Sequence, residues 1–424
     1  MKRIVCFGPG PQFKGGIANY NTSLAKAFDA SGDVEVHIVS WTQQYPAIIP
    51  RDFIDRKSRQ DQLKGTGIKV HYITNYNNPF SWIKTTRLIK NLKPDLVVFQ
   101  WAIAIQGLPL GYIARKLIRS GHHVVFDLHF VKQKEGSTLD ILLTKFGIKN
   151  ANSYVVHARQ TADELSSLFS MRTFTLVEGA VSGKIQNPVL KLYHPVYDMF
   201  KPDPDFNKEL VKSQMGLKEN VFLFFGFIRK YKGLHLAIEA FAKLASMRND
   251  VSLLIVGESF WDTLDNKKFT ARLKNRLFGI AKKIFLRKQD DERDYNPLRL
   301  IDDLNIRDKV VVVNDFVPNE EVHRYFQVSD NLLLFYLTAT PSGVESIGYN
   351  FRMPMLASSV GHFPETVQNG VNGYLAVSED TNDMLRIMNL AIVKPIDRKN
   401  IESTAQNMSW HNYARSIMSL TSSR

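Results

Sequence analysis

The strongest structural signal in the sequence is the stretch Val221-Phe222-Leu223-Phe224-Phe225-Gly226-Phe227-Ile228-Arg229-Lys230-Tyr231-Lys232-Gly233-Leu234. It begins with five apolar residues, which is the length and composition of a buried strand. A basic loop between two glycines follows, and residues 233–247 then continue with helical periodicity. The stretch therefore predicts a strand, a loop and a helix, the repeating unit of a parallel α/β sheet.

Units of the same kind recur in both halves of the chain. Strands are predicted at 2–7, 34–40, 68–73, 95–100, 122–128 and 153–157, and again at 221–226, 251–256, 309–313, 331–335, 354–357 and 373–376. Helices are predicted between them, at 17–30, 80–92, 108–119, 139–149, 159–169, 233–247 and 319–328. This alternation predicts two doubly wound α/β domains facing one another across a cleft. A cluster of prolines places the connector near 190–206.

Composition limits the class of protein. The 424 residues are 44% hydrophobic and 23% charged, which suits two soluble domains. No stretch approaches the ~18 apolar residues of a membrane span, and the N-terminus enters a strand without the pattern of a signal peptide. A single cysteine, Cys6, excludes an internal disulfide, so we expect a cytoplasmic protein. The net charge of +14 favours an anionic partner: nucleic acid, anionic lipid or a phosphorylated small molecule.

The loop after the first strand is the first candidate anion site. It reads Gly8-Pro9-Gly10-Pro11-Gln12-Phe13-Lys14-Gly15-Gly16 and precedes a helix, whose N-terminal amides favour anions. A dinucleotide-binding fingerprint is excluded because the glycine spacing breaks at Phe13 and the second strand ends without an acidic residue. Gly15 and Gly16 remain candidates for phosphate contact, with a purely structural turn as the alternative.

Two further loops follow strands of the second half. Arg229 and Lys232, between Gly226 and Gly233, combine a planar fork with a point charge, which suits two phosphates. The second loop opens a helix and supplies hydroxyls and free amides, with Thr340, Ser342, Gly343, Val344 and Glu345 as candidates. These loops favour a diphosphate over nucleic acid, because a basic stripe with interleaved aromatics is lacking in the sequence.

His129 follows the strand at 122–128, so we expect it to face the cleft, where it is a candidate catalytic residue. A core histidine is the alternative interpretation. Asp203-Pro204-Asp205 spells a possible metal motif, but it lies in the proline-rich connector, so no metal site is predicted.

These segments, in this order, resemble glycosyltransferase family 4 of the GT-B superfamily over nearly the whole chain. The resemblance rests on the following residues: Gly15-Gly16, His129, His194-Pro195-Val196-Tyr197, Gly226, Arg229, Lys232-Gly233, Ser342-Gly343-Val344, Pro354, Val360-Gly361, Glu365, Asn369-Gly370, Asn372-Gly373 and Trp410. It implies an acceptor-side domain at 1–194, a nucleotide-sugar-binding domain at 195–405, and a helix at 406–424 that packs back on the first domain.

The resemblance also implies an activity: retaining transfer of a sugar from a nucleoside diphosphate sugar to a glycan or lipid-linked acceptor, in cell-surface polysaccharide or glycoconjugate synthesis. Arg229 and Lys232 would neutralise the leaving diphosphate. Amides near Gly16 and Gly343-Val344 would add hydrogen bonds, and His129 would face the donor sugar. The family pattern needs no metal or other cofactor.

The sequence departs from that family in two places. Paired glutamates common in the family are missing, since Thr340 and Ile347 fall near their places and Glu345 is the nearest carboxylate. The spacing from Arg229 to Lys232 is also shorter than the common form. A catalytically silent partner protein and a nucleotide-sugar epimerase of the same architecture therefore stay open as alternatives.

Residues 267–288 form an unusual insertion with nine Lys or Arg and no acidic residue. Its apolar residues recur at steps of four and three, which predicts one face of a helix. Such a helix can lie on an anionic membrane surface, so we expect a peripheral association with the inner face of the cytoplasmic membrane. Packing of the apolar stripe on its own domain is the alternative.

Overall fold

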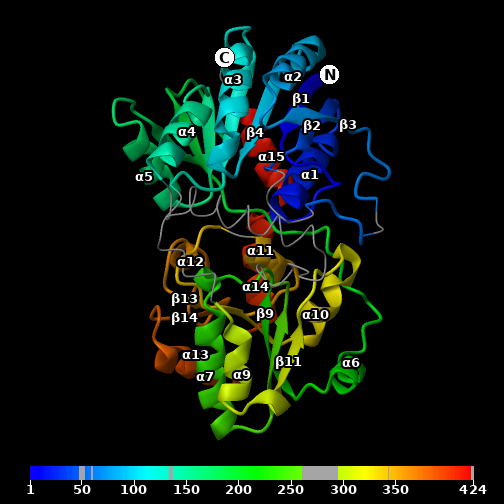
Figure 1. The fold of residues 1–424 in the computed structure, drawn as a ribbon, viewed down its shortest axis with the longest axis vertical. Coiled ribbons are helices and arrows are strands. Elements are labelled where there is room, and N and C mark those ends of the chain that lie inside the picture. Colours follow the sequence, from blue (N-terminus) through cyan, green and yellow to red (C-terminus); the bar gives the residue numbers. More distant parts are fainter. Residues whose placement is uncertain (47–52, 59–60, 133–136, 260–294, 342, 422–424) are drawn as a thin grey trace, which may run out of the picture.

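The structure is a computed structural model of the chain, and it describes all residues except 47–52, 59–60, 133–136, 260–294, 342 and 422–424. It has two α/β halves stacked along the long axis, with a sheet in each (Figure 1). Both sheets are parallel throughout their described ladders. The predicted fold class, two doubly wound domains, is confirmed. The division into a first domain at 1–194, a second domain at 195–405 and a terminal helix at 406–424 stays a proposal.

The first half contains an eight-stranded sheet in the order β3-β2-β1-β4-β5-β6-β8-β7. Its strands are β1 (Lys2–Phe7), β2 (Val34–Gln43), β3 (Lys69–Asn75), β4 (Leu96–Trp101), β5 (His123–Leu128), β6 (Ser153–Val156), β7 (Thr175–Glu178) and β8 (Pro188–Lys191). Its helices are α1 (Gly16–Asp29), α2 (Pro79–Leu92), α3 (Gly107–Ile118), α4 (Thr138–Ile148) and α5 (Arg159–Leu168).

The second half contains a six-stranded sheet in the order β11-β10-β9-β12-β13-β14. Its strands are β9 (Asn220–Phe225), β10 (Val251–Val256), β11 (Val310–Val313), β12 (Asn331–Leu334), β13 (Met355–Ser358) and β14 (Gly373–Ala376). The helices are α6 (Lys208–Met215), α7 (Leu234–Met247), α9 (Leu300–Asp303), α10 (Val322–Val328), α11 (Gly343–Asn350), α12 (Phe363–Thr366), α13 (Thr381–Val393), α14 (Arg398–Asn407) and α15 (Trp410–Ser419). None of the helices in the described part of the chain is long and apolar enough to cross a membrane.

Strands β7 and β8 were not predicted. Strand β7 is an exposed edge strand of four residues, and β8 begins at Pro188 and is also only four residues long. Proline is tolerated at the first position of a strand. Pro188 begins β8, so this proline belongs to the first sheet and not to the connector. The chain leaves the first sheet after Lys191, inside the range expected for the connector.

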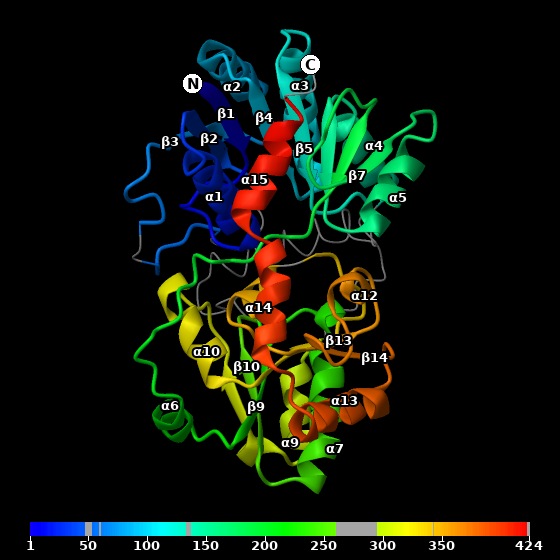
Figure 2. The same cartoon turned by 180° about the vertical axis from the view of Figure 1, so that it is seen from behind.

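Alternating side chains of the first sheet form two cores. Val5, Phe7 and Val97 belong to one core, on the face covered by α2, α3 and α4. Ile4 and Cys6 belong to the other, which includes α1 and α15 and continues into the second half. Helix α14 lies along the second half, and α15 crosses to the first and packs on α1 (Figure 2).

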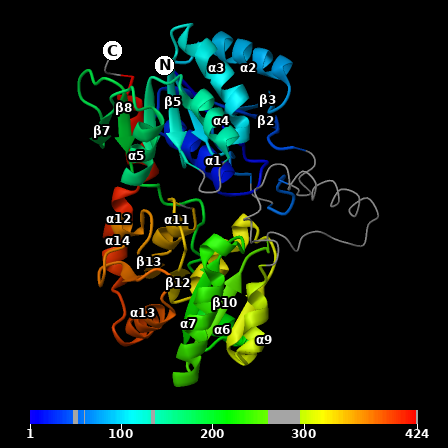
Figure 3. The ribbon, with the colours of Figure 1, turned by 60° about the vertical axis from the view of Figure 1, so that its left-hand side comes forward.

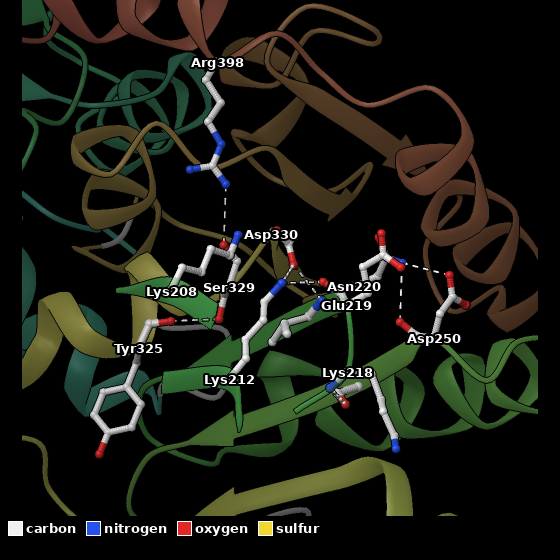
Figure 4. Close-up of polar contacts among 12 residues, drawn as sticks. Lys208, Lys212, Lys218, Glu219, Asn220, Asp250, Tyr325, Ser329, Asp330 and Arg398 are labelled. Carbon is white, nitrogen blue, oxygen red and sulfur yellow. Dashed lines mark hydrogen bonds and ion pairs between the residues drawn. The ribbon is translucent and has the colours of Figure 1, made fainter. Parts of the chain in front are cut away.

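A polar cluster around Asp330 connects α6 to the second sheet, at the end of the sheet away from the first half (Figure 4). The Asp330 carboxylate accepts a hydrogen bond from the backbone amide of Val221 at 2.9 Å and pairs with Lys208 at 2.5 Å. Lys212 lies 3.5 Å from its other oxygen. Helix α6 is thereby tied to the start of β9 and of β12, which leaves the carboxyl ends of these strands to face the first half.

Candidate functional site

In each sheet the strand order reverses beside the first strand, and the two candidate glycine loops follow these first strands. In the first sheet β1 lies between β2 and β4, and the loop from Gly8 to Gly16 follows β1. In the second sheet β9 lies between β10 and β12, and the loop from Gly226 to Gly233 follows β9. Open α/β sheets bind ligands outside the carboxyl ends of strands at such points. The two halves present these ends to one another (Figure 3).

Tyr197, on the connector, bridges the two halves at this place. Its hydroxyl donates a hydrogen bond of 2.8 Å to the carbonyl oxygen of Gly16. Its ring lies so close to the start of α11 that a Cβ on Gly343 would be 2.6 Å from Tyr197 Cε2. Gly15, the N-cap of α1, has φ +102°, a conformation that favours glycine. The N-termini of α1 and α11 therefore meet at one buried tyrosine, which the sequence analysis did not single out as a site residue.

Lys232 lies beside the same helix start. A Cβ on Gly226, whose φ is +97°, would be 2.8 Å from Lys232 Nζ and 3.3 Å from Val344 Cγ2. The structure thus brings Gly226, Lys232 and Val344 together. The turn that carries Lys232 presses on the end of β12, where a Cβ on Gly233 would be 1.9 Å from the Phe335 carbonyl oxygen. Only glycine fits this close approach at φ +64°.

Lys232 is buried, although it lies in a basic loop between two glycines. Its side chain is 7% exposed, since the tight turn at Gly233 directs it inward. Burial, and then the neighbouring Arg229, lower the pKa of Lys232 from 10.5 to about 8. In the part of the chain that the structure describes, Lys232 Nζ has no carboxylate within ion-pair distance, and the ring of Tyr336 lies 5.8 Å away. Arg229 is partly buried, with its guanidinium 5.8 Å from the Tyr231 ring.

His129 is also more enclosed than expected. It follows β5 as predicted, but its side chain is 7% exposed and packs edge-on against Tyr20, with ring centroids 4.8 Å apart. Its Nε2 lies 2.8 Å from Gln100 Oε1. Burial lowers the pKa of His129 to about 4, against the opposing effect of Asp127. The imidazole is therefore neutral at physiological pH, and it can serve as a hydrogen-bonding group but not as a cation.

A buried polar network behind His129 was missed from the sequence. Asp127, fully buried at the end of β5, lies 3.0 Å from His157 Nε2. Its other oxygen lies 2.9 Å from the hydroxyl of Tyr20 and 3.1 Å from that of Tyr413. Tyr413 belongs to α15, so one carboxylate ties the first sheet to α1 and to the terminal helix. The sequence offered no signal for this, because the five residues, His129 included, are scattered between positions 20 and 413 of the chain.

Glu345 lies in the first turn of α11, and its side chain is buried. Its carboxylate lies 2.5 Å from His362 Nε2, and both residues line a small cavity with His194 and Ser346. His194 Nδ1 lies 2.6 Å from Ser346 Oγ, which joins the connector to α11. Of the remaining candidates in this loop, Thr340 is exposed and Ser342 lies outside the described residues.

No group of three or more His, Cys, Asp or Glu in the described ranges could hold a metal ion. The predicted independence from metal stays a prediction, as does the role of 267–288, which lies outside the described residues.

Comparison with known proteins agrees with this geometry. Residues 205–408 match the family model described as glycosyl transferases group 1. No curated protein matches the chain by sequence.

Three solved structures illustrate the similarity in fold. A glycosyltransferase from Rickettsia africae aligns over 99% of this chain and 98% of its own, at a TM-score of 0.65 and 13% identity. Anabaena HepE in complex with UDP aligns over 100% of this chain and 98% of its own, at a TM-score of 0.61 and 14% identity. Sucrose-phosphate synthase from Thermosynechococcus elongatus aligns over 98% of this chain and 95% of its own, at a TM-score of 0.58 and 16% identity. At these identities the similarity shows the fold.

Proposed function

Because residues 205–408 match the family model of group 1 glycosyltransferases and the whole chain has the GT-B fold, we propose that the protein transfers a sugar from a nucleoside diphosphate sugar. The acceptor is a glycan or a lipid-linked glycan, the anomeric configuration is retained, and the product is a cell-surface polysaccharide or glycoconjugate. The finding that the Anabaena structure holds UDP supports the choice of donor.

One observation carries this proposal: a buried, positively charged lysine with no described acidic partner, next to a glycine and a helix N-terminus. An ammonium group is costly to bury without a counter-charge. Lys232 therefore favours an anion, and the amides at the start of α11, beside Val344, favour the same charge. Arg229 also lowers the pKa of Lys232, so a second positive charge lies near this ammonium group and adds to its preference for an anion.

A leaving diphosphate is the group that such a site would stabilise. When the glycosidic bond to the donor phosphate breaks, negative charge develops on the diphosphate, and preorganised cations lower the barrier. Lys232 and Arg229 supply that charge, and the amides near Gly16 and Gly343 add hydrogen bonds. His129 is neutral and faces the donor sugar as a hydrogen-bonding group. Because these side chains provide the positive charge, we propose a reaction that needs neither metal nor other cofactor.

We place Glu345 in the nucleotide-sugar site, where it replaces the paired glutamates that the sequence lacks. Its pairing with His362 fixes the direction of the carboxylate, and its other oxygen has no hydrogen-bond partner in the described structure. We propose that this buried oxygen accepts a hydrogen bond from a ligand hydroxyl when the site is occupied. We also propose a cytoplasmic protein that associates peripherally with the membrane, and that 267–288 contributes to this contact.

The experiment is a panel of nucleoside diphosphate sugars, with release of the nucleoside diphosphate followed by mass spectrometry. The proposal expects release from at least one donor, and a product with the anomeric configuration of that donor by NMR. Binding of a nucleotide sugar without release or transfer would instead identify a silent partner protein. Recovery of an epimerised nucleotide sugar would identify an epimerase, and either result would overturn the proposed transfer.

A further inference from the structure

Helix α4 exposes large apolar side chains on its outer face. Leu139, Ile141 and Leu142 are 52%, 48% and 59% exposed. The helix forms the flank of the first half opposite to β3, and it covers the face of the sheet that α1 and α15 do not cover (Figures 1 and 2). Isolated apolar side chains on a surface are ordinary, but three within four positions of one helix form a patch.

The side chains that pack α4 against its own domain are not those of this patch. A Cβ on Gly107 of α3 would lie 2.3 Å from the Leu143 carbonyl oxygen, and a Cβ on Gly147 of α4 would lie 2.6 Å from Trp101 Cζ3. The two helices therefore approach backbone to backbone through glycines. The buried residues of α4 are Thr144, Gly147 and Ile148, none of which belongs to the exposed patch. The patch is therefore not part of the packing of α4 on the domain.

Basic side chains continue the same face. Lys145 and Lys149 follow Ile141 at steps of four residues, so the three lie in one row along the helix. Beside the last turn, Arg172 donates a hydrogen bond of 2.9 Å to the Lys149 carbonyl oxygen. The one acidic residue of α4, Asp140, is engaged in a capping box with Ser137. We call Leu139, Ile141, Leu142, Lys145 and Lys149 the α4 surface.

The charge of the whole molecule is concentrated in the half that carries the α4 surface. Residues 1–194 contain 25 Lys or Arg and 13 Asp or Glu, a net charge of +12. Residues 195–424 contain 30 and 28, a net charge of +2. Such asymmetry between halves favours contact of one half with an extended anionic partner.

We propose that the α4 surface docks the protein on an anionic lipid bilayer. Its apolar side chains would enter the boundary between headgroups and acyl chains, and its lysines would pair with anionic headgroups. The helix begins after β5, at the end of the first sheet that faces the second half (Figure 3). The cleft would therefore open near the bilayer, which suits the lipid-linked acceptor of the proposed function. The docking itself requires no transferase activity.

The test is flotation of the full-length protein with vesicles of phosphatidylcholine alone or with phosphatidylglycerol. The wild type should float with the anionic vesicles, and less so at high salt. One variant replaces Leu139, Ile141 and Leu142 by serine, and a second carries Lys145→Glu and Lys149→Glu. Each basic residue near the surface contributes about fivefold to binding, so the second variant should lose roughly 25-fold or more in partition coefficient.

Matched controls make the same chemical changes on the second half. Val377→Ser with Val393→Ser removes two valines that are 61% and 63% exposed, and Lys394→Glu with Lys399→Glu reverses two exposed charges. These variants should float as the wild type does. A wild type that stays unbound at low salt, or α4 variants that float like the controls, would overturn the proposal. If only deletion of 267–288 abolishes flotation, the membrane contact belongs to that segment and not to α4. Nucleotide-sugar turnover without vesicles tests the proposed function separately.

Discussion

Replacing Lys232 by methionine should make the ligand-free protein more stable at neutral pH. The fall of its pKa from 10.5 to about 8 corresponds to about 3 kcal/mol of unfavourable free energy for the charged form in the folded state. Methionine has a similar length and carries no charge, so the variant avoids this penalty. Loss of the cation–π contact with Tyr336 offsets part of the gain, about 0.5–1 kcal/mol. We expect a net stabilisation of about 2 kcal/mol.

The sign of the pH dependence follows from the same numbers. Below pH 8, Lys232 is charged in both the folded and the unfolded state, so the wild type carries the full penalty. Between pH 8 and 10.5 the unfolded chain binds more protons than the folded protein, so the stability of the wild type rises with pH. The methionine variant lacks this contribution. The stability difference between the two proteins should therefore shrink as the pH rises through that window.

The assay is urea denaturation of both proteins without nucleotide, from pH 7 to 10. Lys394→Met, at an exposed position, serves as the control, and its difference from the wild type should not change with pH. A Lys232→Met protein that is about 2 kcal/mol less stable than the wild type at every pH would refute the reasoning. It would show that Lys232 has an ion partner that holds it in place.

Three further predictions concern the neighbouring residues. Arg229→Ala should lower turnover by roughly 100-fold with little change in melting temperature, because Arg229 is only partly buried; wild-type turnover would remove its assignment. His129→Ala should lower turnover, and it should lower the stability by about 2 kcal/mol because of the cavity that it leaves. The pH profile of the wild type between 5 and 8 should show no titration of His129, and a folded variant with full activity would identify a core histidine. Glu345→Gln should lower nucleotide-sugar affinity and cost about 1–3 kcal/mol in stability through its bond with His362; unchanged affinity for every nucleotide sugar would place the carboxylate outside the site.

The architecture could be predicted from the sequence because its strands are short apolar runs between helices with clear periodicity. The run at 221–225 fills β9 up to its last residue, and the strand at 2–7 was predicted without error. The edge strand β7 could not be predicted, since a short, exposed strand lacks the apolar run that marks a buried one.

The candidate site was predictable in part. Glycines and basic residues just after strands identified the loops that meet at the two switch points. Burial was not predictable, because the inward direction of Lys232 depends on contact between Gly233 and Phe335, about 100 residues apart. The same holds for the pairing of Glu345 with His362 and for the position of Tyr197 between Gly16 and Gly343. Each is a contact between distant segments, of which a single sequence contains no local trace.

The most direct test of the central claim is a comparison of affinities by titration calorimetry at pH 7. The affinity of the best-binding nucleoside diphosphate is divided by that of its nucleoside, for the wild type and for Lys232→Met. If Lys232 binds the diphosphate, the wild type should prefer the diphosphate by at least about 100-fold, and the variant should lose most of that preference while it still binds the nucleoside. An equal preference in both proteins would contradict the claim that the buried lysine forms the diphosphate site.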